Sequence, residues 1–226
     1  MKRALILDLE TTGTDPTKDK IVEIGMVLYS LEHHTILRCM SALVNSGVGN
    51  AAEAVNGIPA AALIGGITVQ NAFGHLDAWT KSADVALAHN AAFDCSFLEV
   101  NQQARLPWVC TMDDIRWPRP CSSKGLTAIA LAHGLGISHA HRALTDCLTI
   151  ARLLERAHEL GTDVQAMIAR GMRPKARFVV AASGFDEARN ALAKEHGFRW
   201  VKPNWVRTMA IDDAADLPFT VRQEVA

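Results

Sequence analysis

The stretch that decides the fold is Ala4-Leu5-Ile6-Leu7-Asp8-Leu9-Glu10-Thr11-Thr12-Gly13. Its apolar residues predict a buried β-strand that ends at the Thr-Thr-Gly turn. Residues two apart on a strand point to the same face, so Asp8 and Glu10 project side by side. Two carboxylates on an apolar strand repel each other and resist desolvation, and a hard divalent cation with oxygen ligands would offset both effects. The stretch therefore favours a metal site at the end of a core strand.

The composition is that of a globular protein of 226 residues with a formal net charge of −1. No run approaches the roughly 20 apolar residues of a membrane helix, so we expect no membrane association. The N-terminus lacks the pattern of a secretory signal. The five cysteines are odd in number and include no Cys-x-x-Cys pair, which favours reduced thiols. These features together predict a cytoplasmic protein.

Charge is distributed unevenly along the chain. Residues 171–207 contain eight Lys and Arg against three Asp and Glu, a surplus of five positive charges. The chain as a whole has no such surplus, so no overall basic field argues for nucleic acid. This local surplus favours a C-terminal segment that binds a partner. The partner would be the phosphates of a nucleic acid, or a replication or repair protein.

The order of the expected elements predicts an α/β fold. Strands expected at residues 4–11, 21–29 and 34–44 come first, and the later strands, 84–88 and 108–112, alternate with helices. That order predicts a mixed five-stranded sheet flanked by helices on both faces. We expect this domain to span residues 1–165, followed by a linker at 166–176. Residues 177–226 then form a small α+β appendage.

Two further acids lie at comparable structural positions. Asp94 follows a short buried strand and enters a helix, and Asp146 lies in the first turns of a helix expected at residues 141–160. With Asp8 and Glu10, four carboxylates of this kind can hold two Mg²⁺ or Mn²⁺ ions per active site. His141 could take the proton from an attacking water, because the pKa of an unperturbed histidine suits that role.

Three motifs carry a family resemblance: Leu7 to Gly13, His89-Asn90-Ala91-Ala92-Phe93-Asp94, and His141-Arg142-Ala143-Leu144-Thr145-Asp146. In this order they resemble the motifs of the DnaQ-like (DEDDh) 3′–5′ exonucleases. That family includes exonuclease X and the proofreading subunit of bacterial replicative DNA polymerase. The resemblance covers about residues 4–160. It implies a ribonuclease H-like fold and two-metal release of nucleoside 5′-monophosphates. Asp8, Glu10, Asp94 and Asp146 would be the metal ligands, and His141 the general base.

The resemblance also implies contacts with the terminal nucleotides of the substrate. The residues matched to such contacts are Leu9, Thr11, Thr12, Gly13, Phe93, Asn56 and Ile58. Asn56-Gly57-Ile58 stands where many relatives have His-Gly-Ile. Asn56 replaces the histidine, whereas Ile58 matches the relatives and would wedge against the last base. The alternative for this segment is a turn that begins a helix. For Glu23, on the second strand, the alternatives are a satisfied core acid and a supporting role beside the active site.

The segment Arg199-Trp200-Val201-Lys202-Pro203-Asn204-Trp205-Val206-Arg207 interleaves cations with aromatic residues. This pattern is typical of a stacking platform for single-stranded nucleic acid, with Trp200 and Trp205 as the stacking rings. The alternative is that both rings form the core of a small hairpin-containing unit.

The sequence as a whole predicts a metal-dependent 3′–5′ exonuclease for single-stranded nucleic acid, DNA favoured over RNA, in DNA repair or proofreading. The alternatives are an exoribonuclease in RNA turnover and a non-catalytic, replisome-associated binding module.

Overall fold

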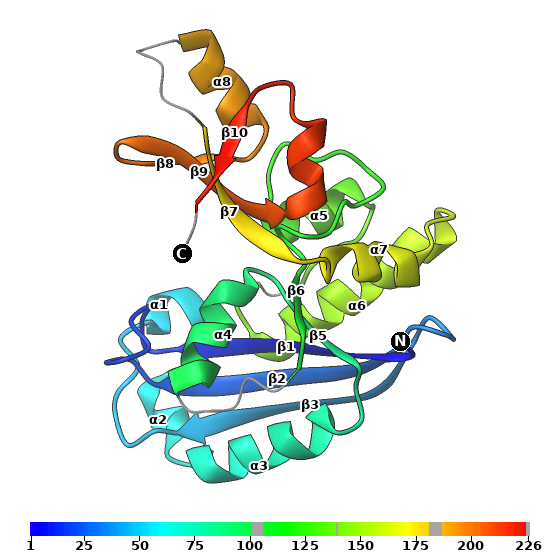
Figure 1. Ribbon diagram of the computed structural model, residues 1–226. Coiled ribbons are helices and arrows are strands. Elements are labelled where there is room, and N and C mark those ends of the chain that lie inside the picture. Colours follow the sequence, from blue (N-terminus) through cyan, green and yellow to red (C-terminus); the bar gives the residue numbers. More distant parts are fainter. Residues whose placement is uncertain (101–105, 139, 181–186, 225–226) are drawn as a thin grey trace. The chain divides into compact units, whose positions relative to one another are not determined.

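The structure is a computed structural model that describes residues 1–100, 106–138, 140–180 and 187–224. The chain forms two compact units, Met1–Arg170 and Gly171–Ala226, and Figure 1 labels most of their helices and strands. Each unit has its own sheet and its own apolar cluster. Within the described residues, no helix combines the length and apolar character that crossing a membrane requires.

The first unit is built on a mixed sheet with the strand order β4-β3-β2-β1-β5-β6. Its strands are β1 (Arg3–Thr11), β2 (Ile21–Ser30), β3 (Thr35–Asn45), β4 (Ile67–Thr68), β5 (Val85–Ala88) and β6 (Trp108–Cys110). Strands β1, β2 and β3 pair antiparallel, and the other neighbours pair parallel. The predicted mixed sheet is confirmed, with six strands instead of five. The additional strand, β4, has only two residues, too few to show a period-2 pattern in the sequence.

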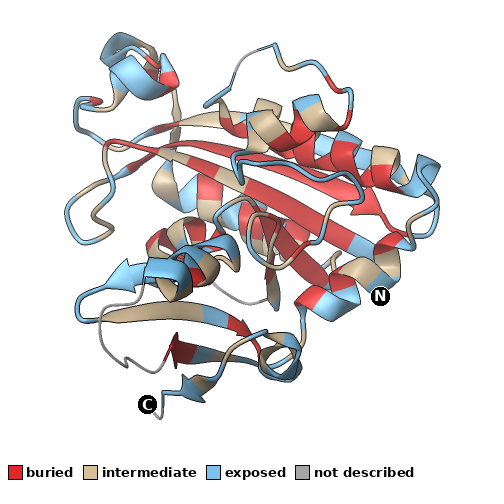
Figure 2. Ribbon diagram, turned by 90° about the horizontal axis from the view of Figure 1, so that it is seen from above, coloured by how far each residue is buried: buried red, intermediate tan, exposed pale blue. Residues whose placement is uncertain are grey.

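Helices cover both faces of this sheet, as the sequence predicts. One face packs against α3 (Val69–Thr80) and α4 (Ala91–Val100), and the other against α6 (Ala143–Glu159), with α5 (Leu126–Ala132) and α7 (Val164–Gly171) nearby. Short helices α1 (Glu53–Asn56) and α2 (Ala60–Leu63) follow β3. Figure 2 shows burial concentrated in the central strands between these helices. Such burial on both faces explains why β2 is apolar along most of its length.

The alternation of side chains along β1 determines where its two acids point. Leu5 and Leu7 pack in the cluster with α3 and α4, whereas Ala4 and Ile6 pack in the cluster with α6. Asp8 and Glu10 continue the second set and therefore face α6. The acids of the strand and the N-terminus of α6 consequently meet at one edge of the sheet.

Gly25 allows α6 to approach the sheet closely. It lies directly opposite Asp8 in the β1–β2 ladder. A Cβ atom at Gly25 would lie 2.3 Å from the carbonyl carbon of Ala143, at the start of α6. Glycine in a buried strand often marks such a backbone approach. The missing side chain is what brings the first turn of α6 beside Asp8.

The second unit is a small α+β structure, as predicted. Its elements are β7 (Lys175–Val180), α8 (Glu187–Glu195), β8 (Arg199–Val201), β9 (Asn204–Ala210), the 3-10 helix η1 (Ile211–Asp216) and β10 (Val221–Gln223). The strands form an antiparallel sheet in the order β10-β7-β9-β8. The segment expected as a linker, residues 166–176, holds most of α7 and the start of β7, because Val164 and Ile168 pack α7 into the core of the first unit.

Candidate active site

Three carboxylates meet where β1 ends and α6 begins. Asp8 and Glu10 come from β1, and Asp146 comes from the first turn of α6. One oxygen from each lies within 4.8 Å of the others, a separation that would let a single metal ion contact all three. The close approach of α6 at Gly25 explains why residues so far apart in the sequence meet here.

Asp94 lies in the same cavity but is held separately. It is buried in the first turn of α4, and its Oδ1 accepts the backbone N–H of Leu9 at 3.0 Å. This bond ties α4 to β1 between the two acids of the strand. Asp94 therefore faces the cluster with one oxygen already bonded.

The electrostatics of these acids favour a cation. Burial, followed by the charges of Asp94, Asp146 and Glu10, raises the pKa of Asp8 well above its ordinary value. Burial and the neighbouring Asp146 also raise the pKa of Glu10, to about 7. Burial likewise raises the pKa of Asp94 and of Asp146. Carboxylates that resist ionisation because they are buried, and because they repel one another, fit a site completed by divalent cations, which take oxygen ligands.

His141 lies outside helix α6, which corrects the expected helix at residues 141–160. The helix begins at Ala143, because Arg142 is extended (φ −133°, ψ 122°) and His141 adopts a left-handed conformation (φ 60°). The backbone N–H of His141 donates to Oδ2 of Asp146 at 3.2 Å. The side chain is exposed and lines the same cavity as the acids. His139, in the preceding loop, lies outside the described residues.

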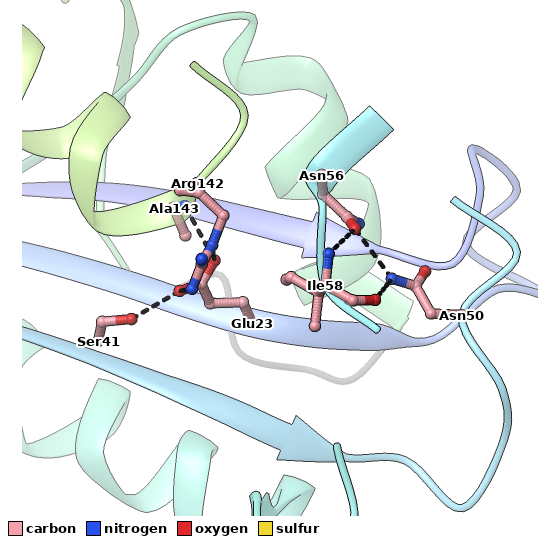
Figure 3. A network of polar contacts seen from close by, with 7 residues as sticks. All are labelled: Glu23, Ser41, Asn50, Asn56, Ile58, Arg142 and Ala143. Carbon is pink, nitrogen blue, oxygen red and sulfur yellow. Dashed lines mark hydrogen bonds and ion pairs between the residues drawn. The ribbon is translucent and has the colours of Figure 1, made fainter. Parts of the chain in front are cut away.

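An ion pair between the buried Glu23 and the half-exposed Arg142 fixes the turn that carries His141 (Figure 3). Glu23 on β2 accepts two hydrogen bonds from Arg142, from Nε and Nη2, both at 3.0 Å. It also accepts the backbone N–H of Ala143 at 3.1 Å and the hydroxyl of Ser41 at 2.8 Å. Burial alone would raise the pKa of Glu23, but these hydrogen bonds hold it below its ordinary value. Glu23 is thus a satisfied acid that anchors the first turn of α6.

Asn56 connects the α1–α2 segment to β1. Its Nδ2 donates to the carbonyl of Thr11 at 3.4 Å, and its nearby amide offsets a small part of the rise in the pKa of Glu10. Its Oδ1 accepts the N–H of Ile58 at 3.1 Å and Nδ2 of Asn50 at 2.9 Å; Figure 3 shows the last two bonds. Asn56 therefore supports the acidic cluster and shapes the turn that precedes α2.

Ile58 does not occupy the place that the resemblance implies. It is only 2% exposed and packs with Val22, Leu43 and Leu63 in a small apolar cluster. A side chain buried in this way has no free face for a terminal base, which corrects the expectation of a wedge. The other alternative, a turn that begins a helix, agrees with the position of Ile58 just before α2.

The cavity around these residues has a volume of about 560 Å³. It is lined by all five residues expected to be catalytic. Of the residues matched to substrate contacts, those that line it are Leu9, Thr11, Gly13, Asn56 and Phe93. Thr12 is instead buried, with its hydroxyl bonded to Asp19 at 3.0 Å.

Sequence reasoning missed part of the cavity wall. Met112 and Gly125 line it from the irregular region before α5, where no periodic pattern marks a wall, and Thr127 lines it from the first turn of α5. His89 also lines it, and its ring nitrogens lie 3.0 Å from the hydroxyl of Thr111 and 2.9 Å from the carbonyl of Lys124. His89 therefore joins β5 to that irregular region.

The two tryptophans of the basic segment lie in the second unit, on the β8–β9 hairpin. Trp200 is 55% exposed, whereas Trp205 is partly buried against the apolar cluster of that unit. The indole N–H of Trp205 donates to Oδ1 of Asn190 on α8 at 2.7 Å. The two rings expected to act together therefore have different surroundings.

The mixed sheet and its acidic cavity define a class of proteins, the nucleases of ribonuclease H-like fold. The chain belongs to the Exonuclease family, whose model matches residues 5–154. Its motifs are those of the DEDDh type. A second match, over residues 185–223, is to a domain of unknown function.

Solved structures agree with this assignment. Exonuclease X in complex with 5′ overhanging duplex DNA is 26% identical, with a TM-score of 0.58 over 74% of this chain and 99% of that chain. The nuclease domain of 3′hExo, a DEDDh family member bound to rAMP, is 18% identical. Its TM-score is 0.59 over 72% of this chain and 94% of that chain, and this similarity shows the shared fold.

The curated relatives are much longer proteins. The PolC-type DNA polymerase III of Thermotoga petrophila is 26% identical over 174 residues, and that of Clostridium perfringens is 28% identical over 167 residues. These alignments cover 69% and 67% of this chain, but only 12% and 11% of the polymerases. The chain thus matches a small part of each polymerase.

Proposed function

We propose that this protein is a 3′–5′ exonuclease that hydrolyses the terminal phosphodiester bond of single-stranded nucleic acid and releases nucleoside 5′-monophosphates. The observation that carries the proposal is the meeting of Asp8, Glu10 and Asp146 within 4.8 Å of one another. Asp94 lines the same cavity, bound to the backbone of β1. These four acids are the proposed ligands of two Mg²⁺ or Mn²⁺ ions.

The proposed chemistry divides between metal ions and protein groups. When bound, two divalent ions would supply an activated water and neutralise the charge that develops on the phosphate. His141 is the proposed general base, because its exposed side chain lines the cavity beside Asp146. Its role is to accept the proton of the attacking water. Phe93, a half-buried ring in the lining, is the proposed contact for the terminal nucleotide, and the buried Asn56 is proposed to position Glu10 and Thr11 beside it.

DNA is the proposed substrate. Exonuclease X was solved with duplex DNA that carries a 5′ overhang, and the curated relatives are DNA polymerases. These similarities support a role in DNA repair or proofreading. All five cysteines are free, which supports action in a reducing compartment such as the cytoplasm. The competing proposal, an exoribonuclease, predicts the opposite substrate preference.

Matched DNA and RNA oligonucleotides of one sequence, labelled at either end, test the proposal in the presence of Mg²⁺ or Mn²⁺. With a 5′ label we expect a ladder of products that shorten from the 3′ end, formed faster from DNA. With a 3′ label we expect the labelled mononucleotide as the first product. Faster digestion of RNA would favour the exoribonuclease, and no digestion of either strand would favour the non-catalytic module.

Asp8→Asn is the variant that tests the acidic cluster, because it keeps the shape of the side chain and removes its charge. We expect it to abolish turnover at saturating metal while the protein stays folded. Asp77→Asn is the matched control, since Asp77 lies on α3 and pairs with the exposed Lys81. The control should digest DNA at the rate of the unmodified protein.

A further inference from the structure

The β8–β9 hairpin of the second unit presents one tryptophan and secures the other. Trp200 and Trp205 pair directly across the antiparallel ladder, so both side chains point to the same face of the hairpin. Their ring centroids lie 5.6 Å apart at an interplanar angle of 61°, an edge-to-face contact. One ring therefore supports the other.

The bonding of Trp205 marks it as the support. Its indole N–H is bonded to Asn190 on α8, and its ring lies against the cluster that contains Phe178 and Phe198. Trp200 remains 55% exposed on strand β8, which is at the edge of the sheet. A large aromatic ring that is held from one side and open on the other suits contact with a flat, apolar partner.

The positive charges around Trp200 indicate that this partner is negatively charged. Arg199 and Lys202 are exposed within two residues of Trp200, and no acid occurs between Arg199 and Arg207. Arg207, on β9, donates to the carbonyl of His196 at 2.8 Å, which adds to the hairpin a third cation, held in place by this bond. A partner that offers both flat rings and negative charges at short spacing is a nucleic acid strand with unpaired bases. In a duplex the flat faces of the bases are already stacked.

We propose that Trp200, flanked by Arg199 and Lys202, is a binding site for single-stranded nucleic acid on the second unit, formed by residues other than those that line the acidic cavity. An unpaired base stacks on the exposed face of Trp200, and the two cations contact neighbouring phosphates. Binding at this site would not depend on the base sequence of the strand, because every base has a flat face that can stack on Trp200. This inference deepens the proposed function, since the strand held is of the class that the acidic cavity would digest.

Binding can be measured without hydrolysis, by fluorescence anisotropy of a labelled oligothymidylate with the full-length protein in EDTA. Trp200→Ala should weaken binding about 5- to 150-fold, the equivalent of one lost base–aromatic stack. Trp200→Phe should retain most of the affinity, because it keeps a flat ring. Val201→Ala is the matched control: Val201 is 49% exposed and points to the opposite face of β8, so its loss should leave the affinity unchanged.

The salt dependence of binding tests the two cations. In the double variant Arg199→Gln and Lys202→Gln, the slope of log affinity against log salt should become shallower by about 1.4, because each phosphate contact on a single strand contributes about 0.7. A blunt duplex of the same length should bind more weakly than the single strand to the unmodified protein. The melting temperature of Trp200→Ala should fall only slightly below that of the unmodified protein, because the ring is 55% exposed and what it loses is its edge-to-face contact with Trp205.

Two results would overturn the inference. One is equal affinity of Trp200→Ala and the unmodified protein for the single strand, which would point to a protein partner for the hairpin. The other is equal affinity for duplex and single strand. The outcome is distinguishable from that of the proposed function: a protein that binds through Trp200 but digests no oligonucleotide would retain this site and lose the exonuclease assignment.

Discussion

Glu10 and Glu23 lie directly opposite each other across the β1–β2 ladder, on the face that α6 covers. Two acids in this arrangement repel each other, but they differ in their hydrogen-bond partners and in their pKa values. Glu23 is saturated by Arg142, Ser41 and the N–H of Ala143, and these bonds lower its pKa. Glu10 belongs to the acidic cluster, and its pKa is raised to about 7. One acid of the pair secures α6, and the other is left for a cation.

The ion pair of Glu23 and Arg142 predicts unequal effects of removing its two partners. The side chain of Glu23 is 2% exposed, whereas that of Arg142 is 42% exposed. Arg142→Met should therefore destabilise the protein by about 1.5–3 kcal/mol, because a buried carboxylate loses charged hydrogen bonds. Glu23→Gln should cost less, since Arg142 can turn its charge to solvent. Urea unfolding measures both variants.

Lys81→Met is the control for this comparison. Lys81 pairs with Asp77 on the surface of α3, and loss of an exposed pair should change stability by at most about 1 kcal/mol. A larger loss for Glu23→Gln than for Arg142→Met would contradict the assignment of Glu23 as the buried, dependent partner.

Substitution of Gly25 should displace helix α6 from the sheet. A methyl group there would lie 2.3 Å from the carbonyl carbon of Ala143, so Gly25→Ala must push α6 away from β2. We expect a loss of about 1–3 kcal/mol, typical of overpacking, together with weaker metal-dependent stabilisation because Asp146 moves with α6.

Gly74→Ala provides the matched control for Gly25→Ala. Gly74 lies inside α3, and a Cβ atom there would have open space around it. The control should gain about 0.5–1 kcal/mol, because alanine favours the helix. Unaltered stability and metal response of Gly25→Ala would show that α6 does not depend on this contact.

The sequence predicted the elements whose patterns are long and regular. Strands β1 and β2, the amphipathic α6 and the separate C-terminal unit all follow from periodicity and from the order of elements. The gathering of Asp8, Glu10 and Asp146 followed from strand alternation and from the motif resemblance. Both kinds of inference rest on signals that lie within one element or one motif.

The remaining features depend on contacts between distant segments. His141 leaves the helix because Arg142 turns its side chain to Glu23, 119 residues away in the sequence. Ile58 is buried by Val22 and Leu63, which no local pattern around Ile58 specifies. Gly25 was a usable signal: a glycine within a buried strand predicts a close approach, although not which helix approaches.

We expect the stability of the metal-free protein to depend on pH, because of the raised pKa of Glu10. The pKa of Glu10 is raised from 4.5 to about 7 in the folded protein. Between these values the folded state keeps a proton that the unfolded state has lost, so the free energy of unfolding falls as pH rises through this window. Glu10→Gln cannot titrate at this position, and its melting temperature in EDTA should therefore fall less steeply from pH 4.5 to 7.

Mn²⁺ should reverse this trend in the unmodified protein, because ligands bind best when the carboxylates are ionised. The melting temperature in Mn²⁺, relative to that in EDTA, should therefore rise with pH over the same window. Parallel melting profiles of Glu10→Gln and the unmodified protein in EDTA would mean that Glu10 titrates normally in the folded state.

The proposed base, His141, can be tested without disturbing its backbone. Its φ of 60° is a conformation that asparagine tolerates better than most residues, so His141→Asn should keep the turn and the N–H bond to Asp146. We expect the rate of DNA digestion to fall about 10²- to 10⁴-fold, the usual scale for loss of a general base. The concentration of Mn²⁺ that gives half-maximal thermal stabilisation should stay the same, because the ring is not proposed as a ligand. A marked increase in that concentration would instead make His141 a metal ligand, and an unchanged rate would exclude it as the base.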